Sequence, residues 1–309
     1  MESAFTTMPP VSRASLSASA DLPLAVGPAI RVAPFSGAAA SPVVSGSSMP
    51  LVATLIANPA RPALTAELAD RAREAVGASR VDWLDEGIAA DIALRDDAAE
   101  TTALAALRAA LGAAPLDVVV QQAAARRKKL LVADMDSTMI DQECIDELAD
   151  EVGLKEHVAA ITARSMNGEI AFEPALRERV ALLAGLDAGV IRRIIDNRIT
   201  LAAGGRTLVA TMNAAGAWTA LVSGGFLSFT GPVAARLGFR ENRANRLIES
   251  GGKLTGEVAD PILGRAAKAE ALVEIAATLG IAVDEAIAVG DGANDLDMLE
   301  LAGAGVALH

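Results

Sequence analysis

The stretch KKLLVADMDSTMIDQE, residues 128–143, decides what kind of fold this chain adopts. An apolar run, Leu130 to Ala133, has the length and composition of a buried strand, and Asp134 and Asp136 follow at its end. Burying one unpaired carboxylate is costly, and placing two like charges in one site costs more. We therefore expect a positively charged group to share this site with them.

The composition places the chain among soluble globular proteins. It has 309 residues, enough for two domains, of which 52% are hydrophobic and 21% charged. The net charge of −12 disfavours binding to nucleic acid or to an anionic membrane, and the low aromatic content of 3%, with no Tyr, disfavours base stacking. The basic run 126–129 is short and is interpreted as a solvated linker. The sequence contains no apolar run of about 18 residues, so no transmembrane helix is predicted.

Cys144 is the only cysteine, so the chain forms no internal disulfide, which fits a reducing compartment such as the cytoplasm. A small buried core residue is the favoured interpretation of Cys144, and a catalytic nucleophile is the alternative. His157 is predicted to be structural or exposed, and His309 is terminal.

Residues 1–48 are rich in Ala, Ser, Pro and Gly, and we expect them to be a disordered extension. They resemble an organelle transit peptide weakly, and the favoured alternative is that Met49 is the true start. Residues 49–125 alternate between strand and helix patterns in the order βαββαβ, which predicts a small α+β domain. The predicted strands and helices lie at 51–57, 64–76, 80–94 (strand, turn, strand), 100–112 and 116–122. The residues leave two interpretations of this domain open, a packing or oligomerisation module and a ligand-sensing domain.

From residue 126 to 309 the pattern becomes α/β. Strands are predicted at 130–134, 219–223 and 286–291, each followed by a polar or glycine-rich turn and a helix, which indicates a doubly wound parallel sheet. Each strand ends in polar residues, and ligands bind at the carboxyl ends of such strands. About 80 residues of helical pattern separate the first two strands. We expect them to form a helical cap over the site, at about 141–205.

The first helix of this cap shows a clear apolar stripe. Ile145, Leu148, Ala149 and Val152 fall at the spacing of one helix face, and Asp141 is a plausible N-cap.

The polar strand ends predict a metal site. Alternation places Asp134 and Asp136 on one side, and Asp291 ends another strand, with Asn294 and Asp295 one helical turn further on. Carboxylates converging from a parallel sheet form a hard oxygen site suited to Mg²⁺. Neither aspartate cluster has the spacing of a calcium-binding loop.

Two further features suggest a phosphate. SGGF at 223–226 offers a hydroxyl and two glycines after a strand, and Lys268 lies in the first turn of a helix, where a cation opposes the helix dipole. Alone, each has an ordinary interpretation, as a turn and as a solvated lysine. A dianionic phosphate together with Mg²⁺ would satisfy all of these groups, the strand-end aspartates, the SGGF turn and Lys268. No nucleotide-binding loop is present, since GGKLT at 251–255 lacks the upstream glycine.

These motifs, in order and spacing, resemble the haloacid dehalogenase-like phosphatases, and within them the phosphoserine phosphatases. The resemblance covers about residues 126–309 and rests on DMDST, SGGF, the lysine of GRAAKAEAL and VGDGAND, with FEPALRERV at 172–180 and ENRANRL at 241–247. Family members continue past GVALH, so we expect the C-terminal end to be truncated. The first domain resembles an ACT-type amino-acid-binding module.

The resemblance implies a mechanism. Asp134 would be the nucleophile that forms an aspartyl-phosphate, and Asp136 the general acid and then the general base. Mg²⁺ would be held by Asp134, Asp291 and the backbone carbonyl of Asp136, with Asp295 in support. The implied phosphate-binding residues are Ser223, Gly224 and Lys268, and Asn294 is expected to contact the substrate.

It also implies how phosphoserine would be selected. Glu143 would bind the ammonium group and Arg179 the carboxylate, while Met166 and Phe172 would be apolar cap residues. Without the resemblance, Arg179 would be interpreted as a surface charge. The alternatives are a phosphatase or phosphotransferase for another small phosphomonoester, and an amino-acid-binding module without turnover.

Overall fold

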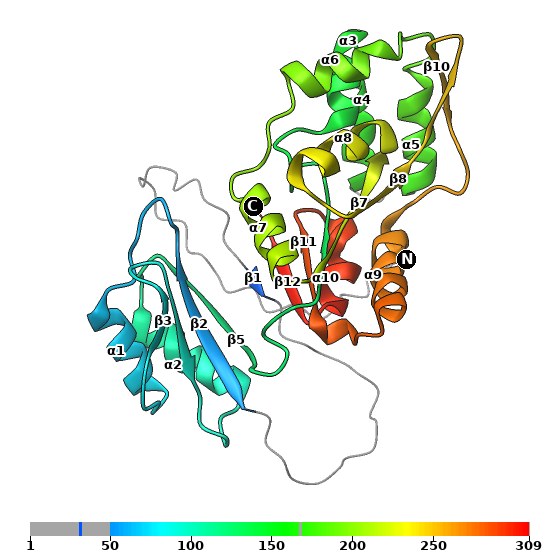
Figure 1. Cartoon of the computed structure of the whole chain (residues 1–309). Coiled ribbons are helices and arrows are strands. Elements are labelled where there is room, and N and C mark those ends of the chain that lie inside the picture. The colour runs from blue at the N-terminus through cyan, green and yellow to red at the C-terminus, as the bar shows by residue number, and fades with distance from the viewer. Residues whose placement is uncertain (1–30, 33–49, 167–168, 309) are drawn as a thin grey trace, which may run out of the picture.

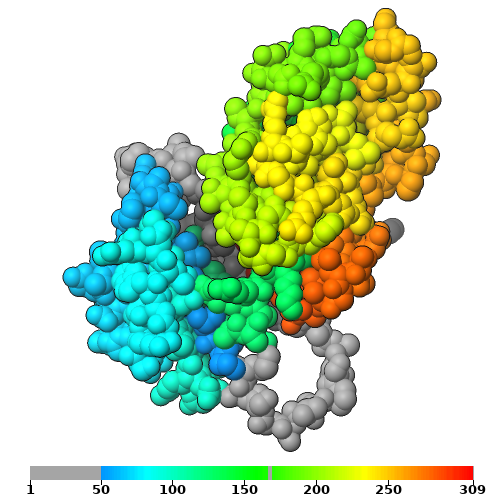
Figure 2. Space-filling view, in the orientation of Figure 1, coloured from blue at the N-terminus to red at the C-terminus, as the bar shows by residue number. Residues whose placement is uncertain are grey.

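The computed structural model describes residues 31–32, 50–166 and 169–308, and it contains a smaller and a larger region (Figure 1). The smaller region runs from blue to cyan in Figure 1, and in Figure 2 it forms a lobe of its own. The larger region carries a parallel sheet with a helical cap above it. No helix in the described part of the chain is long and apolar enough to cross a membrane.

The smaller region is a four-stranded antiparallel sheet with two helices. Its elements are β2 (Leu51–Ala57), α1 (Ala66–Ala75), β3 (Asp82–Asp85), β4 (Ala89–Ala93), α2 (Glu100–Leu111) and β5 (Leu116–Gln122). This is the βαββαβ order predicted from the sequence, with the strands arranged β3-β4-β2-β5. Alternate residues of β2, among them Ala53 and Leu55, pack with Leu107 of α2 in a common core. The intervening Thr54 bonds instead to Asp91 of β4, at 2.7 Å.

The basic run 126–129 is not simply a solvated linker, so this prediction was wrong. Arg126 forms an ion pair of 2.8 Å with the half-buried Asp91 of β4. Lys128 donates a hydrogen bond to the carbonyl of Asp284, and Lys129 pairs with Glu285. Each end of the run is therefore anchored to the region that it adjoins.

The larger region is built on a six-stranded sheet in the order β1-β12-β11-β6-β7-β8. The strands are β1 (Arg31–Val32), β6 (Leu130–Ala133), β7 (Trp218–Phe226), β8 (Glu241–Asn245), β11 (Ala286–Gly290) and β12 (Ala304–Ala307). The helices that flank it are α7 (Gly205–Ala214), α8 (Leu227–Leu237), α9 (Arg265–Leu279) and α10 (Leu296–Leu301), with short 3₁₀ turns η1 (Val283–Glu285) and η2 (Ala293–Asp295). All strand pairs are parallel except β1 with β12. The predicted doubly wound parallel sheet is confirmed.

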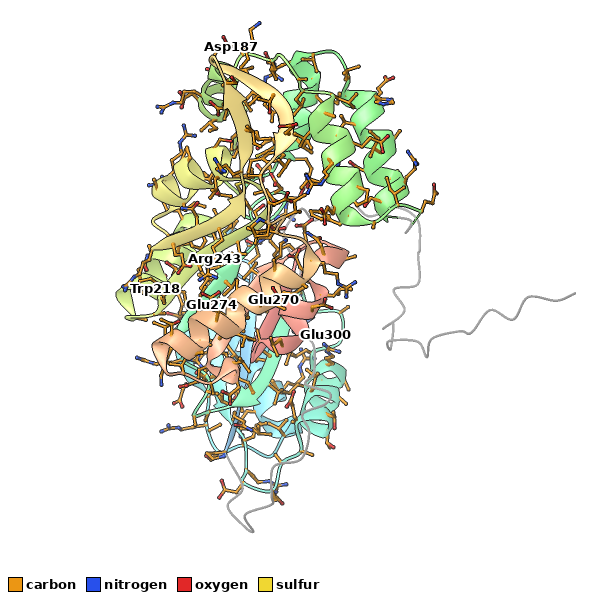
Figure 3. All side chains as sticks on the ribbon, turned by 90° about the vertical axis from the view of Figure 1, so that its right-hand side faces the viewer. Asp187, Trp218, Arg243, Glu270, Glu274 and Glu300 are labelled. Carbon is orange, nitrogen blue, oxygen red and sulfur yellow. The ribbon has the colours of Figure 1, made fainter. Side chains whose placement is uncertain are left out.

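Both faces of β6 are buried, which explains its uninterrupted apolar run. Leu130 and Val132 belong to the core that α9 and α10 cover, whereas Leu131 and Ala133 belong to the core on the side of α7 and α8. At the surface, Arg243 of β8 donates to the carboxylate of Glu274 of α9 at 2.7 Å; both residues are labelled in Figure 3. The sheet is thus held between two helical layers.

The predicted disordered extension, 1–48, lies mostly outside the described residues. Within it, Arg31 and Val32 form β1 and pair with Ala307 and Val306 at the sheet edge. At these two residues the prediction of disorder was wrong, because an open strand edge offers unpaired backbone groups.

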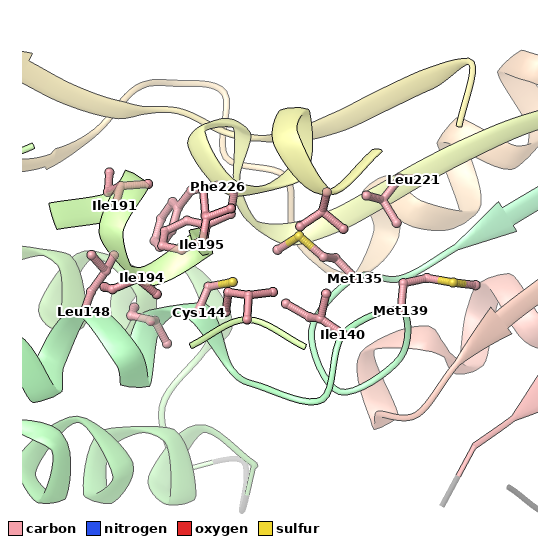
Figure 4. Packing of buried hydrophobic residues seen from close by; sticks show 14 of the residues in the cluster. Met135, Met139, Ile140, Cys144, Leu148, Ile191, Ile194, Ile195, Leu221 and Phe226 are labelled. Atoms are coloured by element: carbon pink, nitrogen blue, oxygen red, sulfur yellow. The ribbon is translucent and has the colours of Figure 1, made fainter. Parts of the chain in front are cut away.

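In the residues that the structure describes, the cap contains four helices: α3 (Cys144–Glu151), α4 (Lys155–Met166), α5 (Phe172–Ala181) and α6 (Gly189–Asn197). Figure 4 shows α3 and α6 packing through Leu148, Ile191 and Ile194, with Cys144 among these apolar residues. The thiol of Cys144 is 1% exposed, so the prediction of a core residue is confirmed. His157 is exposed, as expected.

Two neighbouring chain segments connect the cap to the sheet. The amide of Asp141 donates to the carbonyl of Thr200, and the Thr200 hydroxyl donates to the Asp141 carboxylate at 2.6 Å. Asp141 is therefore part of this junction, and the prediction that it caps α3 was wrong, because Glu143 occupies the N-cap position. Val152 was also misplaced: it follows the last turn of α3 and is exposed.

A β-hairpin that was not predicted from the sequence forms backbone hydrogen bonds with the cap. It consists of β9 (Leu247–Ser250) and β10 (Lys253–Val258), joined by Gly251 and Gly252, both with positive φ. Leu254 exchanges backbone hydrogen bonds with Gly185 and Leu186 of the cap. The GGKLT sequence is thus a hairpin turn followed by the first residues of β10.

Candidate active site

The turn after β6 directs its two aspartates. The strand ends at Ala133, so alternation along the strand does not explain where Asp134 and Asp136 point, and that reasoning was wrong. Instead the carbonyl of Met135 accepts hydrogen bonds from the amides of Thr138, Met139 and Ile140, which closes a tight turn. Inside this turn Ser137 has φ of 51°, a left-handed conformation that costs a non-glycine residue energy.

Lys268 is a positively charged group that pairs with Asp134 in this site. Its Nζ lies 2.7 Å from Oδ2 of Asp134 and 2.6 Å from Oδ1 of Asp295, and its side chain is 2% exposed. The interpretation of Lys268 as a solvated lysine was therefore wrong. Burial lowers its pKa, but the two carboxylates outweigh this effect, so the pKa lies above its usual value. Burial also raises the pKa of Asp134, and Lys268 opposes that shift.

Asp295 organises the loop after β11. One carboxylate oxygen binds Lys268, and the other accepts the amides of Asp291 and Gly292 at 3.2 and 3.0 Å. Thr138, from the turn after β6, donates to Asp291 at 2.6 Å. These bonds join the loops that follow two neighbouring strands.

A metal ion fits this position. Asp134, Asp291 and Asp295 each offer one carboxylate oxygen, and these atoms lie within 4.8 Å of one another. A group of negatively charged oxygen donors matches the preference of hard divalent cations. Asp134 and Asp291 therefore come together as the sequence analysis expected, but the third carboxylate of the group is that of Asp295 and not that of Asp136.

Asp136 lies between the turn and the cap. Its Oδ1 accepts the amide of Cys144, the first residue of α3, at 3.0 Å, so Asp136 satisfies a free amide at that helix end. Its Oδ2 lies 3.5 Å from the hydroxyl of Ser223. Burial raises the pKa of Asp136, against the opposing effect of Cys144. A raised pKa favours the protonated form of this carboxyl group, the form that can donate a proton.

SGGF is the bulged end of β7, where the sequence analysis placed a turn after the strand. The amide of Gly225 donates to Oγ of Ser223 at 2.9 Å. A methyl group on Gly225 would lie 2.7 Å from Oδ2 of Asp136, so only glycine leaves room for that carboxylate. At Gly224 a methyl group would meet the ring of Phe172 at 3.2 Å. The cap thus contacts the strand end here.

The cap contributes two predicted residues of opposite charge. Glu143 accepts a hydrogen bond of 2.6 Å from Ser137. Arg179 is 8% exposed, so its interpretation as a surface charge was wrong. Its guanidinium donates to the carbonyl of Ala175 and to the hydroxyl of Thr162, both at 3.1 Å and both neutral. Burial lowers the pKa of Arg179, and Asp146 and Glu143 oppose this effect. An arginine stays protonated in such a setting.

Two further residues predicted to line the site are Met166 and Asn294. Met166 ends α4, and its side chain lies outside the described part. Asn294 is half-buried in η2, with its side-chain oxygen above Gly292. Thr138 lies within DMDST and Asn245, which bonds to Gly224 and Leu263, lies within ENRANRL, but neither was predicted as a site residue.

A family model of the haloacid dehalogenase-like hydrolases matches residues 131–300, more than half of the chain. The chain belongs to the haloacid dehalogenase-like hydrolase family. Phosphatases of this family use a metal ion, and the Asp134, Asp291 and Asp295 cluster is where one fits.

Among the curated proteins similar to this chain are phosphoserine phosphatases. A phosphoserine phosphatase of Streptomyces coelicolor is 44% identical over 210 residues, 67% of this chain and 50% of the relative. One from Albidiferax ferrireducens is 49% identical over 186 residues, 59% of this chain and 78% of the relative. The chain thus spans half the length of the Streptomyces relative.

Solved structures show the same fold. A haloacid dehalogenase family hydrolase from Salmonella enterica aligns with a TM-score of 0.72 at 29% identity, covering 83% of this chain and 88% of the other. That coverage exceeds the larger region, so the likeness extends into the smaller one. A substrate-bound phosphoserine phosphatase aligns with a TM-score of 0.54 at 41% identity, covering 58% of this chain and 84% of the other.

Proposed function

We propose that this protein is a Mg²⁺-dependent phosphatase that hydrolyses O-phospho-L-serine to L-serine and phosphate, as the last step of serine biosynthesis. The observation that carries the proposal is Arg179, a buried cation whose hydrogen-bond acceptors are neutral. A guanidinium in this state suits a carboxylate of the substrate. The carboxyl group of Glu143, on the same cap, suits an ammonium group. The phosphoserine phosphatases among the relatives support this choice.

Asp134 attacks phosphorus in the first step. One of its oxygens accepts the amide of Met135 at 2.7 Å, which orients the carboxylate. A bond forms between this carboxylate and phosphorus while the bond from phosphorus to the serine oxygen breaks. The departing oxygen takes a proton from Asp136, whose Oδ1 is held by the amide of Cys144, leaving Oδ2 for the transfer. The products of this step are L-serine and an aspartyl-phosphate.

Water completes the reaction. Asp136, now ionised, removes a proton from water, and the resulting hydroxide attacks phosphorus and frees Asp134 with release of phosphate. Lys268 and Ser223 bind the phosphoryl oxygens throughout. Asp134, Asp291 and the backbone carbonyl of Asp136, with Asp295 in support, would hold Mg²⁺, which when bound would neutralise charge on the transferring group.

The test is phosphate release from O-phospho-L-serine in the presence of Mg²⁺. Asp134→Asn should abolish turnover, because an amide is not a nucleophile for phosphorus. The control is Asp297→Asn, which removes an exposed carboxylate paired with Arg265. Normal turnover by Asp134→Asn would exclude the covalent route. A panel of other phosphomonoesters and alcohol acceptors distinguishes a different phosphatase or a phosphotransferase, and binding of serine without any turnover would favour a binding module.

For the smaller region we propose an ACT-type module that binds an amino acid or mediates a homodimer, in a cytoplasmic enzyme. The edge strand β3 exposes Trp83 and Leu84, at 42% and 51%, which supports a packing role. Measuring the molecular mass of the protein in solution, with and without L-serine, tests both roles.

A further inference from the structure

Asn245 is buried beside the proposed phosphate site without belonging to the predicted set of site residues. It is the last residue of β8 and is 2% exposed. Its side-chain oxygen accepts the amide of Leu263 at 2.7 Å, which fixes the orientation of the side-chain amide. Its nitrogen then donates to the carbonyl of Gly224 at 2.8 Å and to that of Leu263 at 3.2 Å. One side chain thus ties together two segments of the site.

The bond to Gly224 controls the orientation of SGGF. The peptide between Gly224 and Gly225 is planar, so holding its carbonyl on one side sets the direction of the Gly225 amide on the other. That amide donates to Oγ of Ser223 at 2.9 Å, and Oγ in turn lies 3.5 Å from Oδ2 of Asp136. Two successive glycines have wide backbone freedom and no side chains to anchor them. Asn245 supplies the anchor.

The bonds to Leu263 extend this control to the lysine. Leu263 directly precedes Gly264, the N-cap residue of α9, and α9 carries Lys268. Because Asn245 holds both the amide and the carbonyl of Leu263, it fixes the start of α9 relative to the end of β7. The groups proposed to bind phosphate from these two elements therefore share one reference point.

We propose that Asn245 is a positioning residue that sets the separation and orientation of Ser223, the Gly224–Gly225 peptide and Lys268 around the phosphoryl group. The inference rests on the proposed function, since it assigns these groups to phosphate. Displacement of reacting or binding groups by as little as 1 Å can cost about a hundredfold in rate.

The experiment compares Asn245→Ala with Asn213→Ala. Asn213 also makes three side-chain hydrogen bonds that join separate elements, to the Gly238 carbonyl, Thr219 and Arg240, but at the opposite end of β7. Both variants should lose thermal stability. Only Asn245→Ala should lower kcat, by about 10- to 100-fold. It should also weaken binding of inorganic phosphate with Mg²⁺, measured by calorimetry, while leaving the affinity for L-serine unchanged.

Phosphate affinity separates this inference from the proposed function. If the wild-type protein does not hydrolyse O-phospho-L-serine, the proposed function fails, whereas phosphate binding by the two variants still decides the role of Asn245. Folded Asn245→Ala with wild-type phosphate affinity, or equal weakening in both variants, would overturn the inference. If Asn245→Ala does not fold, Asn245→Thr replaces it, because threonine fills much of the volume but cannot span Gly224 and Leu263. Wild-type phosphate affinity in that variant would overturn the inference equally.

Discussion

The Nζ of Lys268 lies 2.7 Å from Oδ2 of Asp134, and the two side chains are only 2% and 6% exposed. A pair so far from water is weakly screened, so each charge depends on the other for its stability. Asp295 adds a second buried carboxylate to the same ammonium group. The proposed catalytic centre is therefore also a point on which folding depends.

Lys268→Met should destabilise the protein strongly, because it leaves two buried carboxylates without their cation. Breaking a buried pair in this way costs about 3–5 kcal/mol. The matched control is Lys129→Met, whose ion pair with Glu285 involves a lysine side chain that is 59% exposed. Loss of such an exposed pair should cost less than about 1 kcal/mol. Urea unfolding measures both, and equal losses would contradict the buried pair as a stabilising contact.

Gly225→Ala should impair turnover, because the added methyl group would press against Oδ2 of Asp136 and, at 3.1 Å, against Oγ of Ser223. We expect kcat to fall by about 10- to 100-fold, as for a displaced catalytic group. Gly231→Ala is the control, since its methyl group meets nothing within 4 Å and the residue lies within α8. That change should leave kcat unaltered, and we expect no gain in stability because Pro232 disfavours a helical backbone at a non-glycine residue directly before it. Unchanged kcat in Gly225→Ala would show that Asp136 can shift without consequence.

Arg179→Met should raise KM for O-phospho-L-serine with a smaller change in kcat. A hydrogen bond to a charged group contributes about 1.5–3 kcal/mol, which corresponds to roughly a 10- to 150-fold effect. Phosphoethanolamine lacks the carboxylate, so its kcat/KM should be the same in both proteins. Arg177→Met is the control on the same helix, because Arg177 pairs with Glu173 and Asp260 at the surface. A parallel loss with phosphoethanolamine would argue against carboxylate recognition by Arg179.

The affinity for phosphoserine should depend on pH through Glu143. Displacement of water by protein, and then the charge of Asp136, raises the pKa of Glu143 to about 7. Below that pH the free enzyme carries a neutral carboxyl group, which cannot pair with the substrate ammonium. KM should therefore rise as pH falls through 7, approaching a tenfold change per unit.

Glu143→Gln is the variant that isolates this effect. Its KM should be high at every pH and should lack the dependence near pH 7. The second ionisation of a phosphate ester, near pH 6, should affect both proteins alike. Identical pH profiles of kcat/KM would show that Glu143 does not titrate in this range.

Much of the fold could be predicted because local patterns are strong. β2 and β5 have the predicted bounds, since continuous apolar and β-branched runs leave little choice of structure. Asp141 shows where this reasoning fails. Aspartate is a favoured N-cap residue, yet the carboxylate of Asp141 accepts a hydrogen bond from Thr200, which lies at the other end of the cap sequence. The first amide of α3 donates instead to Asp136. A contact between distant residues overrides the local preference.

By itself the sequence determined the βαββαβ order of the smaller region and the parallel α/β character of the larger one, and it placed Asp134, Ser223 and Asp291 near the carboxyl ends of strands. Both follow from periodicity and composition among neighbours along the chain. Only the tertiary structure decided that Lys268 is the counter-charge of Asp134, that Arg179 is buried, and that Asn245 joins SGGF to the start of α9. Those outcomes depend on burial and on the angle and distance between segments far apart in the chain, which no local pattern encodes.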